Sequence, residues 1–161
     1  MAATGAGETR VCLGIIPVKV RGKSNEIIKT YALLDNGSEV TLCHEQLANK
    51  LELDGERLNF TLTGMTGSTQ MESRVVDLTV MSMDESVVVE LPSVKTVTQM
   101  PISPSCIPKK EDLACWPQLR GIDIPEVGNR EVLLLIGLKE KPSLFLPLEF
   151  KAGGIDEPIA I

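Results

Sequence analysis

The chain has 161 residues, a length that fits one domain with a buried core. Apolar residues make up 43% and charged residues 24%, as in an ordinary globular protein. The formal net charge is -6 and no basic cluster is larger than Lys109-Lys110, which argues against a nucleic-acid-binding surface. Residues 1–10 have no basic segment and no long apolar run, so we expect a flexible leader, no membrane partner and an intracellular protein.

The first part of the chain shows short β patterns and one helical pattern. Residues 11–20 and 27–35 are rich in β-branched and apolar side chains, which predicts two strands. Pro17 lies inside the first run, so we expect that strand at a sheet edge or at a bulge. In residues 44–53 the apolar side chains recur at helical spacing and stop at Asp54-Gly55, which predicts a helix of roughly two to three turns.

The middle of the chain is also mostly β. Residues 58–83 predict two alternating strands around a glycine-bounded tip at 64–68, and residues 87–97 predict another strand. Residues 100–128 contain five prolines and predict a long irregular connection. Trp116 is most simply an anchor of that connection.

The last part of the chain contains the strongest strand signal. Residues 131–137 form an almost continuous apolar run, as in strands that are buried on both faces. Residues 143–150 predict a last strand, and residues 151–161 follow as a tail. The sequence therefore predicts an all-β domain over residues 11–150 with one short helix.

The stretch around Asp35 supports two interpretations. Asn36-Gly37 between two apolar runs is typical of a two-residue β-hairpin, because both residues tolerate positive φ. The same stretch places Asp35 at the end of an apolar strand, directly before a glycine-containing loop. A hairpin should return a full alternating strand, but only about five residues follow before the helical pattern begins. A strand, a loop, a short strand and a helix fit the sequence better.

Cysteine and histidine form a second set of candidates. The four cysteines lack any C-x-x-C pair, and His44 is the only histidine. Zinc needs about four ligands in recognisable pairs, and only Cys43-His44 with the remote Cys106 and Cys115 could supply them, so we favour reduced thiols and no metal. Cys43-His44 is also a poor thiol catalyst, because neighbouring residues of a strand point to opposite faces. We predict no cofactor.

Five blocks of sequence occur in an informative order: ALLDNGSEVTLC, LTGMTGSTQ, WPQLRGIDIPEV, VLLLIG and FLPLEF. Together they resemble the retropepsin-like aspartic proteases, and among these the peptidase of BEL/Pao-type retrotransposon polyproteins. The first block resembles the catalytic loop of that family and the second its flap tip. The third resembles the element before the second apolar strand, the fourth the apolar-apolar-Gly signature behind the catalytic loop, and the fifth the strand after it.

The resemblance implies a retropepsin-like closed β-barrel that is completed as a homodimer. Asp35 would be the catalytic carboxylate, supported by Asn36, Gly37 and Ser38, with the Ser38 hydroxyl bonded to Asp35. Because the chain has a single D-x-G-S motif, the second carboxyl must come from the other copy in a two-fold dimer. Residues 151–161 are then either an intersubunit strand or a plain tail.

The resemblance also assigns the substrate-binding and packing residues. The flap that closes over an extended peptide or polyprotein would consist of Gly64, Met65, Thr66, Gly67 and Ser68. Behind the catalytic loop would lie Ile136 and Gly137. Glu39 would either pair with Lys139, as a carboxylate and a cation of these two blocks do in the family, or belong to a solvated face.

The expected function is therefore that of an aspartic endopeptidase that processes a retroelement polyprotein. Two positions depart from the family pattern. Asn36 stands where a Thr or Ser hydroxyl bonds across the dimer, and Leu138-Lys139 replaces a polar or acidic continuation. These departures define the alternative, a retropepsin-like peptide-binding or assembly module with weak or no turnover. The plainer interpretation of Asp35 is a turn residue in an unrelated β-domain.

Overall fold

The structure is a computed structural model that describes residues 13–64, 67–139, 141–146, 149, 151–155 and 157. Its strands are Ile15–Arg21 (β1), Ile27–Asp35 (β2), Leu42–His44 (β3), Glu56–Gly64 (β4), Gly67–Met81 (β5), Val88–Val97 (β6) and Val132–Gly137 (β7). Its helices are Glu45–Lys50 (α1) and Lys110–Ala114 (α2), with 3-10 helices at Pro104–Cys106 (η1), Pro117–Leu119 (η2) and Pro142–Phe145 (η3). The described part of the chain is therefore mainly β, as predicted. None of its helices has the length and apolar composition that crossing a membrane requires.

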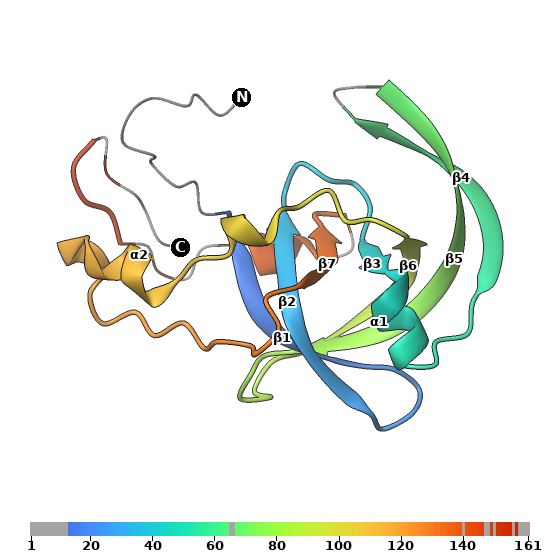
Figure 1. Ribbon diagram of the computed structural model, residues 1–161, viewed down its shortest axis with the longest axis horizontal. Coiled ribbons are helices and arrows are strands. Elements are labelled where there is room, and N and C mark those ends of the chain that lie inside the picture. The colour runs from blue at the N-terminus through green and yellow to red at the C-terminus, as the bar shows by residue number, and fades with distance from the viewer. Residues whose placement is uncertain are drawn as a thin grey trace.

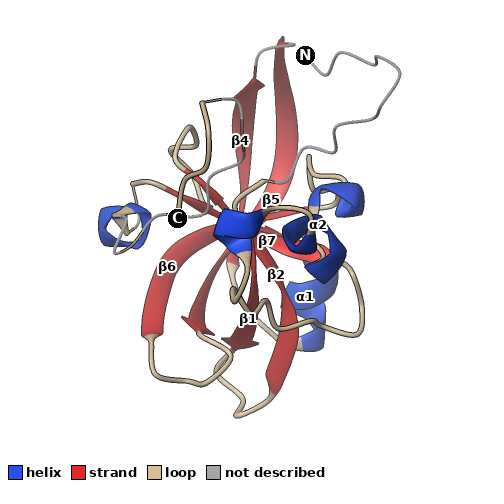
Figure 2. Ribbon diagram, turned by 90° about the vertical axis from the view of Figure 1, so that its left-hand side faces the viewer, coloured by secondary structure: helices blue, strands red, loops and turns tan. Residues whose placement is uncertain are grey.

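Six of the strands form a closed ring (Figure 1). They follow one another in the order β1, β2, β7, β3, β6 and β5, and β5 pairs back to β1. Within the described residues β4 pairs with β5 alone, along its whole length. The β4–β5 hairpin therefore extends beyond the ring, as both views show (Figures 1 and 2). The closed arrangement agrees with the prediction, whereas the homodimer concerns two chains and stays a prediction.

The strand edges explain how Pro17 is accommodated. Pro17 is paired with Tyr31 of β2, but β1 reaches β5 only from Lys19 to Arg21. Among the described residues, the first half of β1 therefore has a free edge on the β5 side, where a missing N–H costs no ladder hydrogen bond. The prediction of an edge position for Pro17 is confirmed in this local sense.

Two apolar cores pack against opposite faces of β2 and β7. The first core includes Val20, Leu47 and Leu134, and the second includes Ile15, Val97 and Leu135. In β2, Ala32 and Leu34 contact the first core, whereas Tyr31 and Leu33 belong to the second, which is the alternation expected of a strand. All six residues of β7 are buried, so the prediction of a strand covered on both faces is confirmed. Strand β2, buried from Thr30 to Leu33, and the fully buried β7 thus run parallel through the centre of the fold.

The predicted helix exists but is shorter than expected. Helix α1 has six residues, and the Nδ1 atom of His44 caps it by accepting the N–H of Gln46 at 3.0 Å. An isolated helix of this length is unstable in water, so its stability comes from the burial of Leu47 and Ala48 in the first core. The helix ends early because Glu52 adopts a positive φ of 50°.

The strand, loop, short strand and helix predicted around Asn36-Gly37 are confirmed, because β2 pairs with β1 and β7 rather than with β3. Another prediction about local structure is wrong. The strand predicted over residues 143–150 begins instead as the 3-10 helix η3, with Pro142 in its first turn. Proline favours the first turn of a helix because its φ is already fixed. The N–H that proline lacks would have no partner within the helix at that position.

Some predictions lie outside the described residues. The leader at 1–10 is one, and so are Met65 and Thr66 of the predicted flap and most of the second half of the predicted last strand.

Candidate active site

Asp35 is the last residue of β2, and its position is fixed by β7. The two strands run parallel at this end, with Leu34 opposite Ile136 and Asp35 opposite Gly137. Because both strands are anchored in the cores, the loop that follows Asp35 begins at a rigid point beside the end of β7. The structure thus brings Asp35 next to Ile136 and Gly137, while the roles predicted for these residues stay predictions.

A tight turn holds the Asp35 side chain. Its Oδ1 atom accepts the N–H of Gly37 at 2.9 Å, and its main-chain carbonyl accepts the N–H of Ser38 at 3.2 Å. The residue is half-buried, whereas Asn36 and Gly37 are exposed. Within the described part of the chain, Oδ2 of Asp35 has no hydrogen-bond partner. The turn thus orients one carboxylate oxygen and leaves the other available to a substrate, a water molecule or a second chain.

The predicted hydrogen bond from Ser38 to Asp35 is wrong. The Ser38 hydroxyl donates to the carbonyl of Val40 at 2.9 Å and accepts the N–H of Val40 at 3.3 Å. A hydroxyl has one proton, which is therefore used within the loop. Ser38 supports the loop by closing it on itself, since serine side chains bond readily to main-chain groups two residues away.

Gly137 lies directly beneath this loop. A Cβ atom added there would be 2.6 Å from the carbonyl oxygen of Val40 and 2.8 Å from that of Ser38, so only glycine fits. The N–H of Gly137 donates to Oγ1 of Thr41 at 3.1 Å, and the N–H of Leu138 donates to the carbonyl of Ser38 at 2.9 Å. The end of β7 is therefore joined to the Asp35 loop by two hydrogen bonds and one close backbone approach.

Thr41 is a site residue that the sequence did not indicate. It is buried, with 3% of its surface exposed, and its hydroxyl is the acceptor that holds the N–H of Gly137. Its main-chain carbonyl also accepts the N–H of Lys95 in β6. A threonine just before a short apolar run is common in any β-protein, so no local signal marks this one.

We expect Gly137→Ala to lower the free energy of unfolding by about 1–3 kcal/mol, because two main-chain oxygens would have to move to admit the methyl group. Gly128→Ala is the matched control. Its added Cβ would meet no atom within 4 Å, so its change should stay within about 0.5 kcal/mol. Urea unfolding of the two variants measures both values, and equal stabilities would contradict the close approach at Gly137.

The remaining predicted residues of the loop are exposed. Glu39 and Lys139 both lie at the surface, and the ion pairs of the described residues do not include them. The solvated-face interpretation of Glu39 therefore fits the structure, and the Glu39–Lys139 pair does not. Leu138 is 39% exposed and gives the loop a small apolar neighbour.

The described residues of the predicted flap, Gly64, Gly67 and Ser68, lie at the described end of the β4–β5 hairpin. Gly64 and Gly67 pair across its described end, and the hydroxyls of Thr63 and Ser68 lie 2.9 Å apart. Gly67 has a φ of 131°, a conformation that side-chain-bearing residues rarely adopt. Gly64, Gly67 and Ser68 are exposed. The hairpin projects on the same side of the ring as the loop after β2 (Figure 1).

The cysteine and histidine candidates have other roles. The Cys43 thiol is fully buried, and burial raises its pKa to about 12. It is therefore protonated at neutral pH, whereas a catalytic cysteine must react as the thiolate. His44 caps α1. The described residues contain no group of three or more His, Cys, Asp or Glu side chains that could bind a metal ion together.

Comparisons with known proteins add little to this geometry. No family model matches the chain, and no curated protein does. Among solved structures, the chain is similar to a Legionella pneumophila protein with unknown function (DUF785), with 15% sequence identity and a TM-score of 0.35 over 86% of this chain and 91% of that chain. A likeness this distant carries no functional argument.

Proposed function

We propose that the chain is one half of a homodimeric aspartic endopeptidase, in which Asp35 and its counterpart from a second copy form the catalytic pair. The observation that supports this proposal most is the placement of Asp35. A carboxylate stands at the end of a buried strand, is oriented by the N–H of Gly37, and is followed by an exposed turn. Ordinary turn residues do not need the close approach of a second buried strand that Gly137 provides.

The chemistry requires two carboxyl groups. In peptide hydrolysis one carboxylate removes a proton from water, whose oxygen bonds to the carbonyl carbon, while a carboxylic acid protonates the carbonyl oxygen. The amide nitrogen then accepts a proton and leaves as the C–N bond breaks. Two carboxylates about 3 Å apart cannot both be charged, so such a pair holds one proton. One chain offers one such loop, and a two-fold axis beside the exposed Asn36-Gly37 turn would supply the second.

The β4–β5 hairpin suits an extended peptide substrate. Strand β4 has a free edge along all nine of its residues within the described chain, so its main-chain N–H and C=O groups are available for strand addition. The resemblance of the five sequence blocks points to a retroelement polyprotein as the substrate, and the dimer partner would be a second copy of this chain.

A second candidate function is peptide binding or assembly without hydrolysis. Two observations favour it. Asn36 lacks the hydroxyl expected after the catalytic aspartate, and the hydroxyl of Ser38 is directed to Val40 instead of Asp35. Both would weaken the positioning of a carboxyl pair, but neither affects the hairpin edge.

An incubation with a denatured protein and a peptide library separates the two functions. The protease predicts new peptide termini, detected by mass spectrometry, and their suppression by a statine-type transition-state analogue. The binding module predicts peptides that are retained by the protein but stay intact. An absence of both cleavage and retention at high protein concentration would contradict both candidates.

A further inference from the structure

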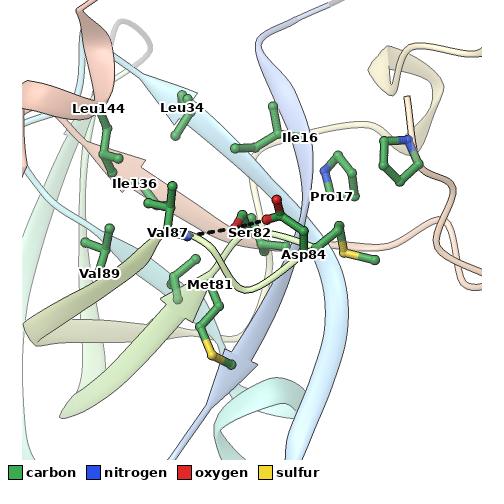
Figure 3. A pocket seen from close by; sticks show the side chains of 14 residues that line it. Ile16, Pro17, Leu34, Met81, Ser82, Asp84, Val87, Val89, Ile136 and Leu144 are labelled. Carbon is green, nitrogen blue, oxygen red and sulfur yellow. Dashed lines mark hydrogen bonds between the residues drawn. The ribbon is translucent and has the colours of Figure 1, made fainter. Parts of the chain in front are cut away.

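The structure has a hollow on the side of β2 that Leu34 faces. It is a cavity of about 540 Å³ between β1, the β5–β6 turn, β7 and η3 (Figure 3). This volume is within the range of about 300–1,000 Å³ that is typical of small-molecule sites. Leu34 lines the cavity, and the next residue of the strand, Asp35, points to the opposite face. The cavity is therefore a separate site.

The walls of the cavity are almost entirely aliphatic. Val89, Ile136 and Leu144 converge on it from three different elements (Figure 3). Ile16 and Val87 also line it and are 41% and 51% exposed, so its mouth is apolar and open to solvent. Such walls match a hydrocarbon chain, because moving apolar groups out of water into an apolar cavity favours binding.

One solvent-exposed carboxylate, that of Asp84, lies at the edge of the cavity. Oδ1 of Asp84 accepts hydrogen bonds from the Ser82 hydroxyl at 2.6 Å, the Ser86 hydroxyl at 2.8 Å and the Ser86 N–H at 3.2 Å. The Ser82 and Ser86 hydrogen bonds lower the pKa of Asp84 to about 2, so the group is charged throughout the physiological range. Figure 3 shows this carboxylate beside Ser82 and facing the side of Ile16 and Pro17.

The charge of Asp84 is not balanced by a cation in the described part of the chain. The neighbouring Glu85 is paired with Lys19 at 2.5 Å. Oδ2 of Asp84 has no hydrogen-bond partner among the described residues. An open apolar cavity therefore has a fixed, unpaired negative charge at its edge.

We propose that this cavity binds a small amphipathic cation, with an aliphatic chain between Val89, Ile136 and Leu144 and an ammonium group at Asp84. Charge complementarity selects this occupant. A fatty acid of the same length would place its carboxylate beside Asp84, and the net charge of -6 adds to that repulsion. The function of this site is independent of peptide hydrolysis at Asp35.

Three probes with the same chain length test the proposal: octylammonium, octanol and octanoate, titrated at pH 7 into the full chain below their aggregation concentrations. Calorimetry or ligand-observed NMR gives the dissociation constants. We expect octylammonium to bind about two- to fivefold more tightly than octanol, which is the range of a solvent-exposed ion pair, and octanoate to bind most weakly. Equal binding of octylammonium and octanoate would overturn the proposal.

Matched variants locate the site. Asp84→Asn should remove the preference for octylammonium and leave octanol binding unchanged, because the amide oxygen can still accept the turn hydrogen bonds. Asp54→Asn removes the same charge at an exposed position that does not line the cavity, and the preference should remain. The same effect from both variants would mean that net charge, not the cavity, selects the cation.

A cavity-filling variant tests the apolar half of the site. Val89→Trp should abolish binding of octylammonium and octanol alike, and Leu144→Trp, on the other side of the cavity, serves if the first variant does not fold. Circular dichroism checks the fold of each. If no probe binds the unmodified chain, the proposal is wrong. If no probe binds and Val89→Trp changes the sedimentation coefficient, we conclude that a second copy of the chain covers the cavity.

Discussion

Asp35→Asn is expected to abolish peptide cleavage while the chain stays folded. Asparagine keeps an oxygen that accepts the N–H of Gly37, so the turn should persist. It cannot act as either base or acid, and in a homodimer both members of the pair are lost at once. We expect the initial cleavage rate to fall by at least roughly 10⁴-fold, since acid–base groups each contribute factors of about 10² to 10⁴.

Two controls accompany this variant. Asp54→Asn changes an exposed aspartate and should leave the cleavage rate unaltered. Urea unfolding of Asp35→Asn should give a stability within about 1 kcal/mol of the unmodified chain, which shows that the loss is chemical. Cleavage that persists in a pure Asp35→Asn preparation would contradict the protease proposal. The proposal of a cation site at Asp84 is tested separately and does not depend on this result.

The strands were predictable because their signals are local. Alternating or continuous apolar residues identify β2, β5 and β7 from the sequence, and the full burial of β7 follows from its unbroken apolar run. The pairings that close the ring were not predictable in the same way. Contact between β1 and β5 joins residues about 60 positions apart through three residue pairs, and such contacts depend on the packing of the whole chain.

In the candidate site, too, the features with a local sequence signal could be predicted and those that depend on the fold could not. Asp35 and Gly137 could be named from sequence because each ends an apolar strand in a recognisable block. The partner of the Ser38 hydroxyl could not, because several acceptors lie within two residues of it and the loop geometry selects among them. Thr41 and the apolar cavity were missed since both arise from elements that are far apart in sequence.

The second large effect that we expect is a dependence of the specific cleavage activity on protein concentration. If the pair of carboxyls is built from two chains, the monomer has no activity, and specific activity should rise with concentration until the dimer is saturated. Asp35→Asn chains added to the unmodified protein should inhibit it, because mixed dimers have one carboxyl. The net charge of -6 on each chain opposes association, so added salt should raise the activity of dilute samples by screening that repulsion.

The same pair of carboxyls determines the response to pH. On the acidic side both groups are protonated and no base remains, whereas on the alkaline side both are charged and no acid remains, so the rate profile should be bell-shaped. Repulsion between the two charged carboxylates also weakens the dimer. The alkaline limb should therefore move to higher pH as protein concentration increases, while the acidic limb stays in place.

Initial rates at several protein concentrations across the pH range, with sedimentation on the same samples, measure all of these effects together. The decisive comparison is between the concentration at half-maximal activity and the dimer dissociation constant, which should agree at each pH. A monomer whose specific activity is independent of concentration, and which excess Asp35→Asn chains fail to inhibit, would rule out a pair built from two chains. Since the chain has a single D-x-G-S loop, that result would also leave Asp35 without the second carboxyl that the chemistry requires.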